Sequence, residues 1–222
     1  MKGYYLIVTA VCICSLISGC AIQPKTKPDL SALYAYKPRS ILVVPVLNES
    51  PEVNASSVFI STITKPLAER GYYVFPVYLT SLILRDFGLA EAGHIHQLAT
   101  PQLFELFGTD AVLYVTIKEW STKYIGISSS VMIEMDYELK DAKTSTSLWQ
   151  SKERVAVQSG GAEGGLIMMV VSAAMHALFM DYLPLAKQAN KQAFVPPKGL
   201  PAGPYNPDYG RDHENRLGRV YS

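Results

Sequence analysis

The stretch VMIEMDYEL, residues 131–139, alternates apolar residues at odd positions with Met132 and the acidic residues Glu134, Asp136 and Glu138. Successive side chains of a β-strand point to opposite faces of a sheet, so this pattern predicts a strand with one buried face and one acidic face. A polar turn at residues 141–147 follows, and residues 148–158 then predict a return strand. The stretch therefore predicts one strand of a long β-hairpin.

The charges of this hairpin can be interpreted in two ways. Glu134, Asp136 and Glu138 share the acidic face of the first strand, and Lys152 and Arg154 lie on one face of the second. Opposite charges that face each other across a hairpin contribute about 0.2–1 kcal/mol per pair. A charge-matched, solvated sheet face is therefore favoured over a pair of carboxylates for acid/base catalysis.

The residues around the hairpin predict further short elements. The apolar run at 40–46 predicts a buried strand, and residues 55–70 predict a helix that Asn54 caps, Gly71 ends and Pro66 kinks or divides. We also expect strands at 72–76 and 111–120, and helices at 77–87, at 100–107 with Thr100 as its cap, and at about 184–193. This order predicts an α/β (α+β) fold in which helices pack a mixed β-sheet that ends in the long hairpin.

The chain begins with a segment that we expect to lie outside the fold. Lys2 is the only charged residue before Lys25, and residues 4–17 are almost wholly apolar. About fourteen apolar residues suit the hydrophobic region of a signal peptide and are few for a membrane span. The segment ends in Ile17-Ser18-Gly19-Cys20, which resembles a bacterial lipobox.

This resemblance implies that residues 1–19 are a lipoprotein signal peptide. Ile17, Ser18 and Gly19 would be recognised by the signal peptidase, and cleavage would follow Gly19. Cys20 would carry a diacylglyceryl thioether and an acylated amine, and a non-acidic Ala21 implies export to the outer membrane of a Gram-negative cell. An ordinary signal peptide, or an uncleaved anchor with a chance cysteine, is the alternative.

The cysteine count agrees with this interpretation. Cys12 and Cys14 lie in the segment that would be removed, and Cys20 would carry lipid. The mature chain would then have no thiol for a disulfide, a cysteine metal site or a cysteine nucleophile.

Composition divides the rest of the chain into three parts. Residues 20–38 contain the lipidated cysteine, three prolines and several lysines, and predict an extended tether. Residues 39–193 are expected to form a single α/β domain, and residues 194–222 a flexible tail rich in Pro, Gly and Tyr. With 49% hydrophobic residues and a net charge of +1, the chain is neither wholly disordered nor basic enough to suggest nucleic-acid binding.

Few residues suggest catalysis or metal binding. His94 and His96 form an H-x-H pair beside Glu91, but no third ligand is evident, and exposed loop histidines are favoured. Gly164 and Gly165 could cradle an anion, although they lack the remainder of a phosphate-binding motif. No nucleophile elbow, zinc-protease motif or calcium loop is present in the sequence. We therefore predict a protein that is not an enzyme and has no cofactor or metal.

Residues 166–180 are apolar almost without interruption and have no polar stripe. Such a segment must be buried, either in the core of this chain or against a partner or a bilayer. It is too short to cross a membrane comfortably, and a core helix is favoured.

Several motifs together resemble a known family. These are the lipobox, ILVVP at 41–45, PLAERGYYVFP at 66–76 and FGTDAVLY at 107–114. They resemble an uncharacterised family of Gram-negative lipoproteins of the genome-derived surface antigen type, over about residues 17–190. The resemblance implies a domain similar to the amino-terminal domain of TolB, also seen in curli-secretion-type and penicillin-binding-protein-activator lipoproteins. Such domains bind proteins.

The expected function is that of an outer-membrane lipoprotein with its domain in the periplasm. It would act as a non-catalytic binding or assembly factor for envelope proteins, among them a curli-secretion-type lipoprotein, and could form homo-oligomers. One alternative is an envelope hydrolase that uses a Ser or His site, with a deep pocket at His94 or His96. Another is a secretion-pore subunit with residues 127–158 as a membrane hairpin, although the charged outer row argues against a lipid face.

Overall fold

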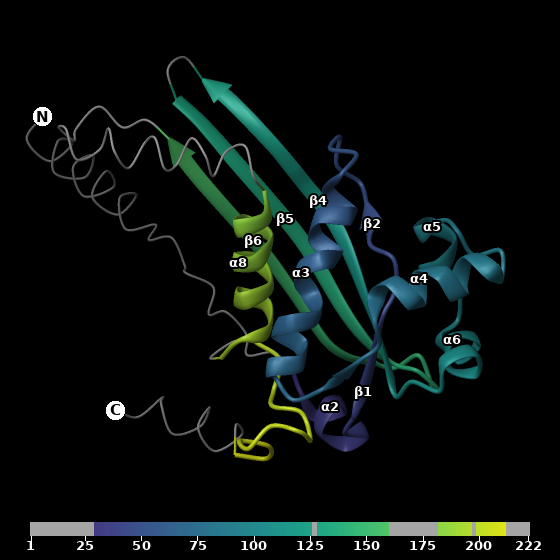
Figure 1. The fold of residues 1–222 in the computed structure, drawn as a ribbon. Coiled ribbons are helices and arrows are strands. Elements are labelled where there is room, and N and C mark those ends of the chain that lie inside the picture. The colour runs from purple at the N-terminus through teal and green to yellow at the C-terminus, as the bar shows by residue number, and fades with distance from the viewer. Residues whose placement is uncertain (1–28, 126–127, 160–181, 197–198, 212–222) are drawn as a thin grey trace, which may run out of the picture.

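The computed structural model describes residues 29–125, 128–159, 182–196 and 199–211. It shows a mixed sheet packed by helices, so the predicted fold class is confirmed (Figure 1). The strands run in the order β3-β1-β4-β5-β6, and β2 also pairs with β4. Their bounds are β1 Ser40–Val43, β2 Leu47–Asn48, β3 Tyr73–Val74, β4 Ala111–Ile125, β5 Ser128–Asp141 and β6 Ser147–Ser159. The helices are α2 Ser31–Tyr36, α3 Ala55–Glu69, α4 Val77–Asp86, α5 Ala92–Ile95, α6 Thr100–Phe107 and α8 Leu183–Phe194.

The predicted hairpin is present and forms the long antiparallel part of the sheet. β5 pairs with β4 on one side and with β6 on the other, whereas β1, β2 and β3 are parallel to their neighbours. The Asp141 carboxylate accepts the backbone N–H groups of Lys143 at 3.1 Å and Thr144 at 2.7 Å. An aspartate that binds the backbone two and three residues ahead favours a tight turn, so this contact directs β6 back along β5.

A β-bulge lets β4 bury residues at uneven spacing. Ile117 lies opposite Met135 and Glu119 opposite Glu134, so Lys118 is an extra residue without a partner in the ladder. The bulge keeps Trp120 on the same buried face as Ile117, although an uninterrupted strand would place residues three apart on opposite faces.

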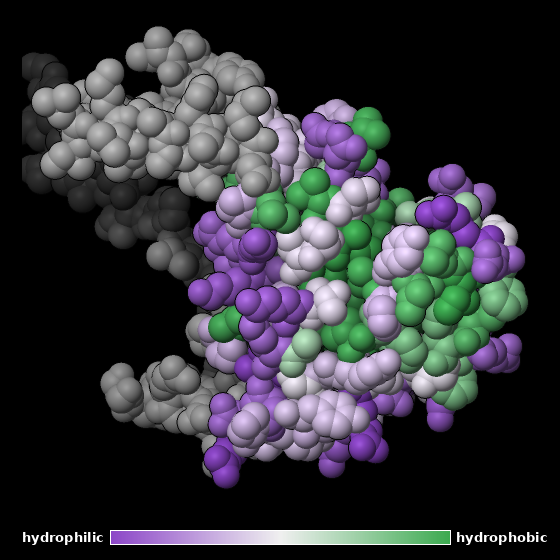
Figure 2. Space-filling view, in the orientation of Figure 1, coloured by the Kyte–Doolittle hydropathy of each residue, from purple (hydrophilic) through white to green (hydrophobic). Residues whose placement is uncertain are grey.

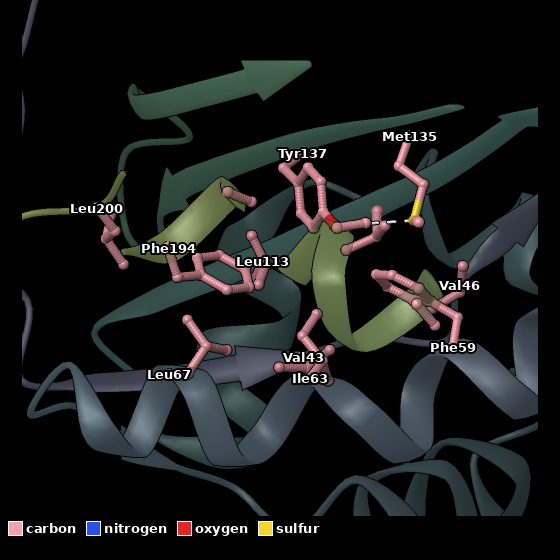
Figure 3. Packing of buried hydrophobic residues seen from close by; sticks show 14 of the residues in the cluster. Val43, Val46, Phe59, Ile63, Leu67, Leu113, Met135, Tyr137, Phe194 and Leu200 are labelled. Atoms are coloured by element: carbon pink, nitrogen blue, oxygen red, sulfur yellow. Dashed lines mark hydrogen bonds between the residues drawn. The ribbon is translucent and has the colours of Figure 1, made fainter. Parts of the chain in front are cut away.

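One face of the sheet carries the main core. α3 directs Phe59, Ile63 and Leu67 toward the strands, and α8 lies beside α3 over β5 and β6 (Figures 1 and 3). Within this core the hydroxyl of Tyr137 donates to Asn190 at 3.1 Å, and the Asn190 amide donates to Thr62 at 2.8 Å. Because buried polar groups must find partners, this chain of bonds specifies how α3, α8 and β5 fit together.

The opposite face is covered differently. α4, α5 and α6 pack there over β1 and the first part of β4, through Leu84, Ile95 and Leu103 against Leu42 and Val112 (Figure 1). On this same face of β6, Lys152 and Arg154 are exposed. The alternation predicted for the hairpin therefore separates a packed face from a polar one.

The two predicted helix caps have different outcomes. Asn54 is the N-cap residue of α3, as predicted, although its side chain makes no capping bond. Thr100 lies inside α6 rather than before it, and its hydroxyl donates instead to the Asp141 carbonyl at 2.9 Å, which ties α6 to the hairpin turn. α3 also runs unbroken through Pro66, which lies in its last turn. A proline there costs a single intrahelical bond, and burial of Leu67 compensates.

The domain extends beyond both predicted boundaries. Leu33 of α2 is buried in the main core, so residues 31–36 of the predicted tether belong to the fold. Phe194 and Leu200 of the predicted flexible tail are buried in the same core. The prediction relied on Pro and Gly content, whereas two large apolar side chains supply enough burial to order the chain around them.

The described part of the tail crosses the C-terminal end of α3. The carbonyls of Leu200 and Pro201 accept hydrogen bonds from Arg70 Nε at 2.9 Å and from the Tyr72 hydroxyl at 3.0 Å. Gly71 has a φ of +85°, and a Cβ there would lie 2.4 Å from the backbone nitrogen of Asn206. Only glycine satisfies both the positive φ and this close approach, which explains why α3 ends where the tail crosses.

The remaining predicted segments lie outside the described residues. These are the signal peptide 1–19, the first part of the tether, the glycine pair Gly164-Gly165, the apolar segment 166–180 and residues 212–222. Among the described helices, none has the length and apolar character needed to cross a membrane.

Candidate functional site

The lipidation residues predicted from the sequence cannot be placed on the fold. Ile17, Ser18, Gly19 and Cys20 all lie outside the described residues, so their roles stay predictions. The site is therefore built from the remaining sequence candidates and from the surface of the described domain.

The two histidines of the H-x-H pair do not form a common site. His94 lies on the short helix α5 and is exposed, as expected, whereas the expectation of an exposed loop is wrong for His96, which is half-buried. The Nε2 atom of His96 lies 3.0 Å from the carbonyl oxygen of Pro45, and its ring contacts Tyr114 edge-on with 5.2 Å between centroids. Since a carbonyl can only accept, Nε2 carries the proton. Within the described residues, no three His, Cys, Asp or Glu side chains are grouped so as to hold a metal ion.

Burial also sets the protonation states of His96 and Tyr114. Loss of solvent lowers the pKa of His96, and the nearby Lys140 cation lowers it further, against the opposing effect of the Pro45 hydrogen bond. Burial raises the pKa of Tyr114 to about 12, and the Glu138 carboxylate adds to the rise. Both side chains are therefore neutral at physiological pH and pack α5 against β4.

We expect acidification to destabilise the protein through His96. In the unfolded chain His96 ionises near pH 6.5, but its pKa is lower in the folded state. Between these two values the unfolded state binds more protons, so the free energy of unfolding falls as the pH decreases below about 6.5. His96→Gln keeps an N–H donor for Pro45 and should show a smaller loss of stability between pH 7.5 and pH 5 in urea titrations. The exposed His94→Gln is the matched control, and an equal change in the two variants would contradict this assignment.

The acidic row of the hairpin is a charge-matched sheet face. Asp136 lies opposite Lys152, with Nζ 3.2 Å from the carboxylate, and Glu134 lies opposite Arg154. Glu138 lies 3.1 Å from Lys140. These pairs are solvent-exposed or half-exposed, so each contributes at most about 1 kcal/mol. The arrangement supports the structural interpretation over an acid/base pair.

The surface over α4 is apolar, and the sequence analysis did not identify it. Tyr78 is 70% exposed, Leu79 52%, Ile83 39% and Phe87 63%, and Tyr73 of the edge strand β3 is 53% exposed. Leu79, Ile83 and Phe87 share one side of the helix, and we call these three residues the α4 face. Figure 2 shows hydrophobic residues, in green, gathered in the region of α4, with hydrophilic residues around them.

The exposure of the α4 face follows from the way α4 packs. Thr80 and Leu84 are the buried residues of α4, and they point toward the sheet. Leu79, Ile83 and Phe87 are spaced four residues apart and therefore form a stripe along another side of the same helix. This four-residue spacing is the feature of the sequence from which the stripe could have been predicted. A helix that is apolar on more than one side, however, does not indicate which side is buried.

The strand next to α4 extends the apolar surface through aromatic contacts. The Tyr73 ring meets Phe75 edge-on at 5.2 Å, and Phe75 meets Phe107 of α6 edge-on at 6.2 Å. Edge-to-face pairs of this kind contribute about 0.5–1.5 kcal/mol beyond area burial. Phe75 and Phe107 also pack against the cluster that contains Leu84, the buried residue of α4.

Comparisons with known proteins agree on one family. A family model described as "Putative lipoprotein GNA1162-like" matches residues 28–203. The chain belongs to this family. The "Putative lipoprotein NMB1124/NMB1162" of Neisseria meningitidis serogroup B is 33% identical over 177 residues, which are 80% of this chain and 82% of that protein. The predicted family is therefore confirmed.

A solved structure from the same family supports the fold. The crystal structure of the lipoprotein GNA1162 from Neisseria meningitidis is 35% identical, with a TM-score of 0.54. The match covers 65% of this chain and 100% of that one. Membership of a GNA1162-like lipoprotein family is consistent with the lipobox predicted at residues 17–20 and indicates a protein of the cell envelope.

Proposed function

We propose that the protein is a lipid-anchored lipoprotein of the outer membrane whose periplasmic domain binds other proteins without catalysis. Family membership supports the lipoprotein character, and the order of charge, apolar segment and Ile17–Cys20 supports lipidation at Cys20. The similarity to the TolB amino-terminal domain stays a prediction, as does a curli-secretion-type partner.

The α4 face is the observation that carries the binding role. A large apolar side chain that is fully exposed presents about 200 Å², so Leu79, Ile83 and Phe87 at exposures of 39–63% present roughly 300 Å². Contiguous apolar patches on monomeric proteins rarely exceed a few hundred Å², and patches of this size are often functional. A patch that remains in water costs free energy that contact with another protein would recover.

The chemistry of the described candidates supports binding over catalysis. His96 donates to a backbone carbonyl and packs on Tyr114, and the Asp136 and Glu138 carboxylates form ion pairs with Lys152 and Lys140. Each of these groups has a structural role, and none supports the alternative of a hydrolase. The inner face of the hairpin packs against α3 and α8, which does not favour its use as a membrane hairpin of a pore.

Site-specific photocrosslinking in intact cells tests the binding role. A photoreactive phenylalanine analogue at Phe87 should yield a crosslinked product that contains an envelope protein, whatever its identity. The same analogue at Val53, which is 86% exposed and lies outside α4, is the matched control. We expect Leu79→Asp to abolish the Phe87 product, because a carboxylate in an apolar contact is not tolerated. Equal products at Phe87 and Val53, or none at Phe87, would contradict the proposal.

A further inference from the structure

We infer that one end of the domain, the end formed around α2, rests against the membrane that holds the lipid of Cys20. This α2 end consists of residues 29–39, the β5–β6 turn at 142–147 and the described tail at 199–211. The inference rests on the proposed lipidation at Cys20 and adds a lipid surface as a binding partner of the domain itself. It is carried by the length of the tether, by the place where the tether joins the fold and by the side chains exposed there.

The α2 end gathers three segments that are distant in the sequence. The hydroxyl of Tyr36, the last residue of α2, lies 3.5 Å from that of Thr146 in the β5–β6 turn. The backbone N–H of Tyr205 in the tail donates to the carbonyl of Gly71 at 3.0 Å, two residues before β3 begins. Because β1, β3 and β6 all begin at the same end of the sheet, both contacts lie there. Figure 1 shows α2 and the described tail at this end, with the connection between β4 and β5 at the opposite end.

The tether is too short to hold the α2 end far from the membrane. Nine peptide units separate Cys20 from Asp29, the first described residue. A fully extended chain spans at most about 3.6 Å per residue, so the tether reaches no further than roughly 32 Å whatever its conformation. The Asp29 carboxylate accepts the backbone N–H of Ser31 at 2.9 Å, and Leu33 of α2 is buried in the main core. The limit therefore applies to the folded domain, because the tether joins it directly at α2.

The length of the sheet excludes the inverted orientation. β4 has 15 residues, and a strand rises about 3.3 Å per residue, so its far end lies about 45 Å from the α2 end. A domain that stood on the far end of β4 would hold α2 beyond the reach of the tether.

Two flat orientations are also disfavoured. With the open face of the hairpin on the membrane, the carboxylates of Glu134, Asp136 and Glu138 would lie against phosphate headgroups of the same charge. With the opposite face down, α3 and α8 would meet the lipid, and neither exposes a large apolar side chain in its described residues. An upright domain on its α2 end is therefore favoured.

The side chains exposed at the α2 end suit a membrane–water boundary. Tyr36 is 44% exposed, Tyr205 61% and Tyr209 43%. Tyrosine combines an apolar ring with a polar hydroxyl, and for this reason it is enriched at the boundary between membrane and water. The exposed charged residues of this end are four cations and two carboxylates: Lys37, Arg39, Lys143, Arg211, Asp29 and Asp208. This excess of cations favours contact with lipid phosphates.

Fluorescence quenching in lipid vesicles tests this inference with the full lipoprotein. The protein is reconstituted in vesicles of phosphatidylethanolamine and phosphatidylglycerol whose headgroups carry a nitroxide quencher. Three exposed alanines are replaced one at a time by cysteine and labelled with a fluorophore: Ala35 of α2, Ala90 beyond the end of α4 and Ala156 toward the far end of β6. The introduced cysteine is the one free thiol of the mature chain, since Cys20 would be a thioether. We expect the label at Ala35→Cys to lose most of its fluorescence, and the labels at Ala90→Cys and Ala156→Cys to lose little.

A second set of variants separates lipid contact from tethering alone. Tyr205→Ser combined with Tyr209→Ser should lower the quenching at Ala35→Cys about twofold or more, because the rings that enter the headgroup layer are lost. Tyr78→Ser is the matched control, since this tyrosine of α4 is 70% exposed, and it should leave the quenching unchanged. All three tyrosines are exposed, so each variant should keep the wild-type circular dichroism spectrum and melting temperature. Equal quenching in the double variant and the control would overturn the contact.

The outcomes separate this inference from the proposed function. A protein that does not stay on the vesicles has no lipid anchor, and both proposals would then be wrong. A vesicle-bound protein with no quenching at any of the three labels, or with the strongest quenching at Ala156→Cys, would overturn the inference and leave the anchor in place. The strongest quenching at Ala90→Cys would also overturn it, and would assign the α4 face to lipid instead of protein binding.

Discussion

Cys20→Ser should abolish fatty-acid labelling of the protein and its recovery in the outer-membrane fraction. Serine lacks the thiol that would receive the diacylglyceryl group, so cleavage after Gly19 should also fail and the precursor should accumulate. Each buried CH2 of an acyl chain contributes about 0.8 kcal/mol to membrane binding, so loss of two or three chains removes almost all of the anchoring. This is the largest effect that we expect from any single substitution in the chain.

The measurement is metabolic labelling with a clickable fatty acid, combined with membrane fractionation and intact mass determination. Cys14→Ser is the matched control, because it changes a thiol six residues away within the segment that would be discarded. This control should be labelled, cleaved and sorted as the wild type is. If Cys20→Ser is labelled as strongly as Cys14→Ser, the lipidation site is wrong.

Phe194→Ala should destabilise the domain by about 3–5 kcal/mol, as is usual for a large aromatic side chain removed from a core. The Phe194 ring is fully buried and lies near Tyr137 (Figure 3), with 5.4 Å between the centroids. It also packs against Trp149, with 5.6 Å between the centroids. Its removal would leave a cavity between α8 and two strands of the hairpin. The free energy of unfolding from urea titration measures the loss.

The neighbouring residue provides the control for this substitution. Val195 is partly exposed and follows the end of α8, so Val195→Ala should change the free energy of unfolding by no more than about 0.5 kcal/mol. Similar small effects in the two variants would show that the predicted flexible tail begins at residue 194 after all, and that Phe194 contributes little to the core.

The parts of the fold that were predicted well depend on neighbouring residues. The period of two in residues 131–139 specifies which side chains of β5 are buried, because alternate side chains of a strand point to opposite faces. The opposite charges that face each other across the hairpin, such as Asp136 and Lys152, followed from the same pattern. The helix predicted at about 184–193 is also present, as α8. Each of these signals lies within a few residues along the chain.

The errors arose where a residue has its partner far away. Threonine is common at helix caps, yet the Thr100 hydroxyl donates to the carbonyl of Asp141, which is 41 residues away. Leu200 has the surroundings of a disordered tail, yet its carbonyl accepts from Arg70, which is 130 residues away. His96 also has a distant partner, because the Pro45 carbonyl that it contacts is 51 residues away along the chain. Local composition cannot report contacts at these separations.

The amino-acid order was enough to identify the family and the amphipathic hairpin and to predict a leader with a lipobox, because each is encoded in contiguous residues or in a short period. The three-dimensional fold was needed to learn which side of α4 faces the sheet. α4 has apolar residues on more than one side, and the sheet on which it packs joins strands that are distant in the chain. Burial of Thr80 and Leu84 there leaves Leu79, Ile83 and Phe87 in water, and this exposure creates the surface to which we assign binding.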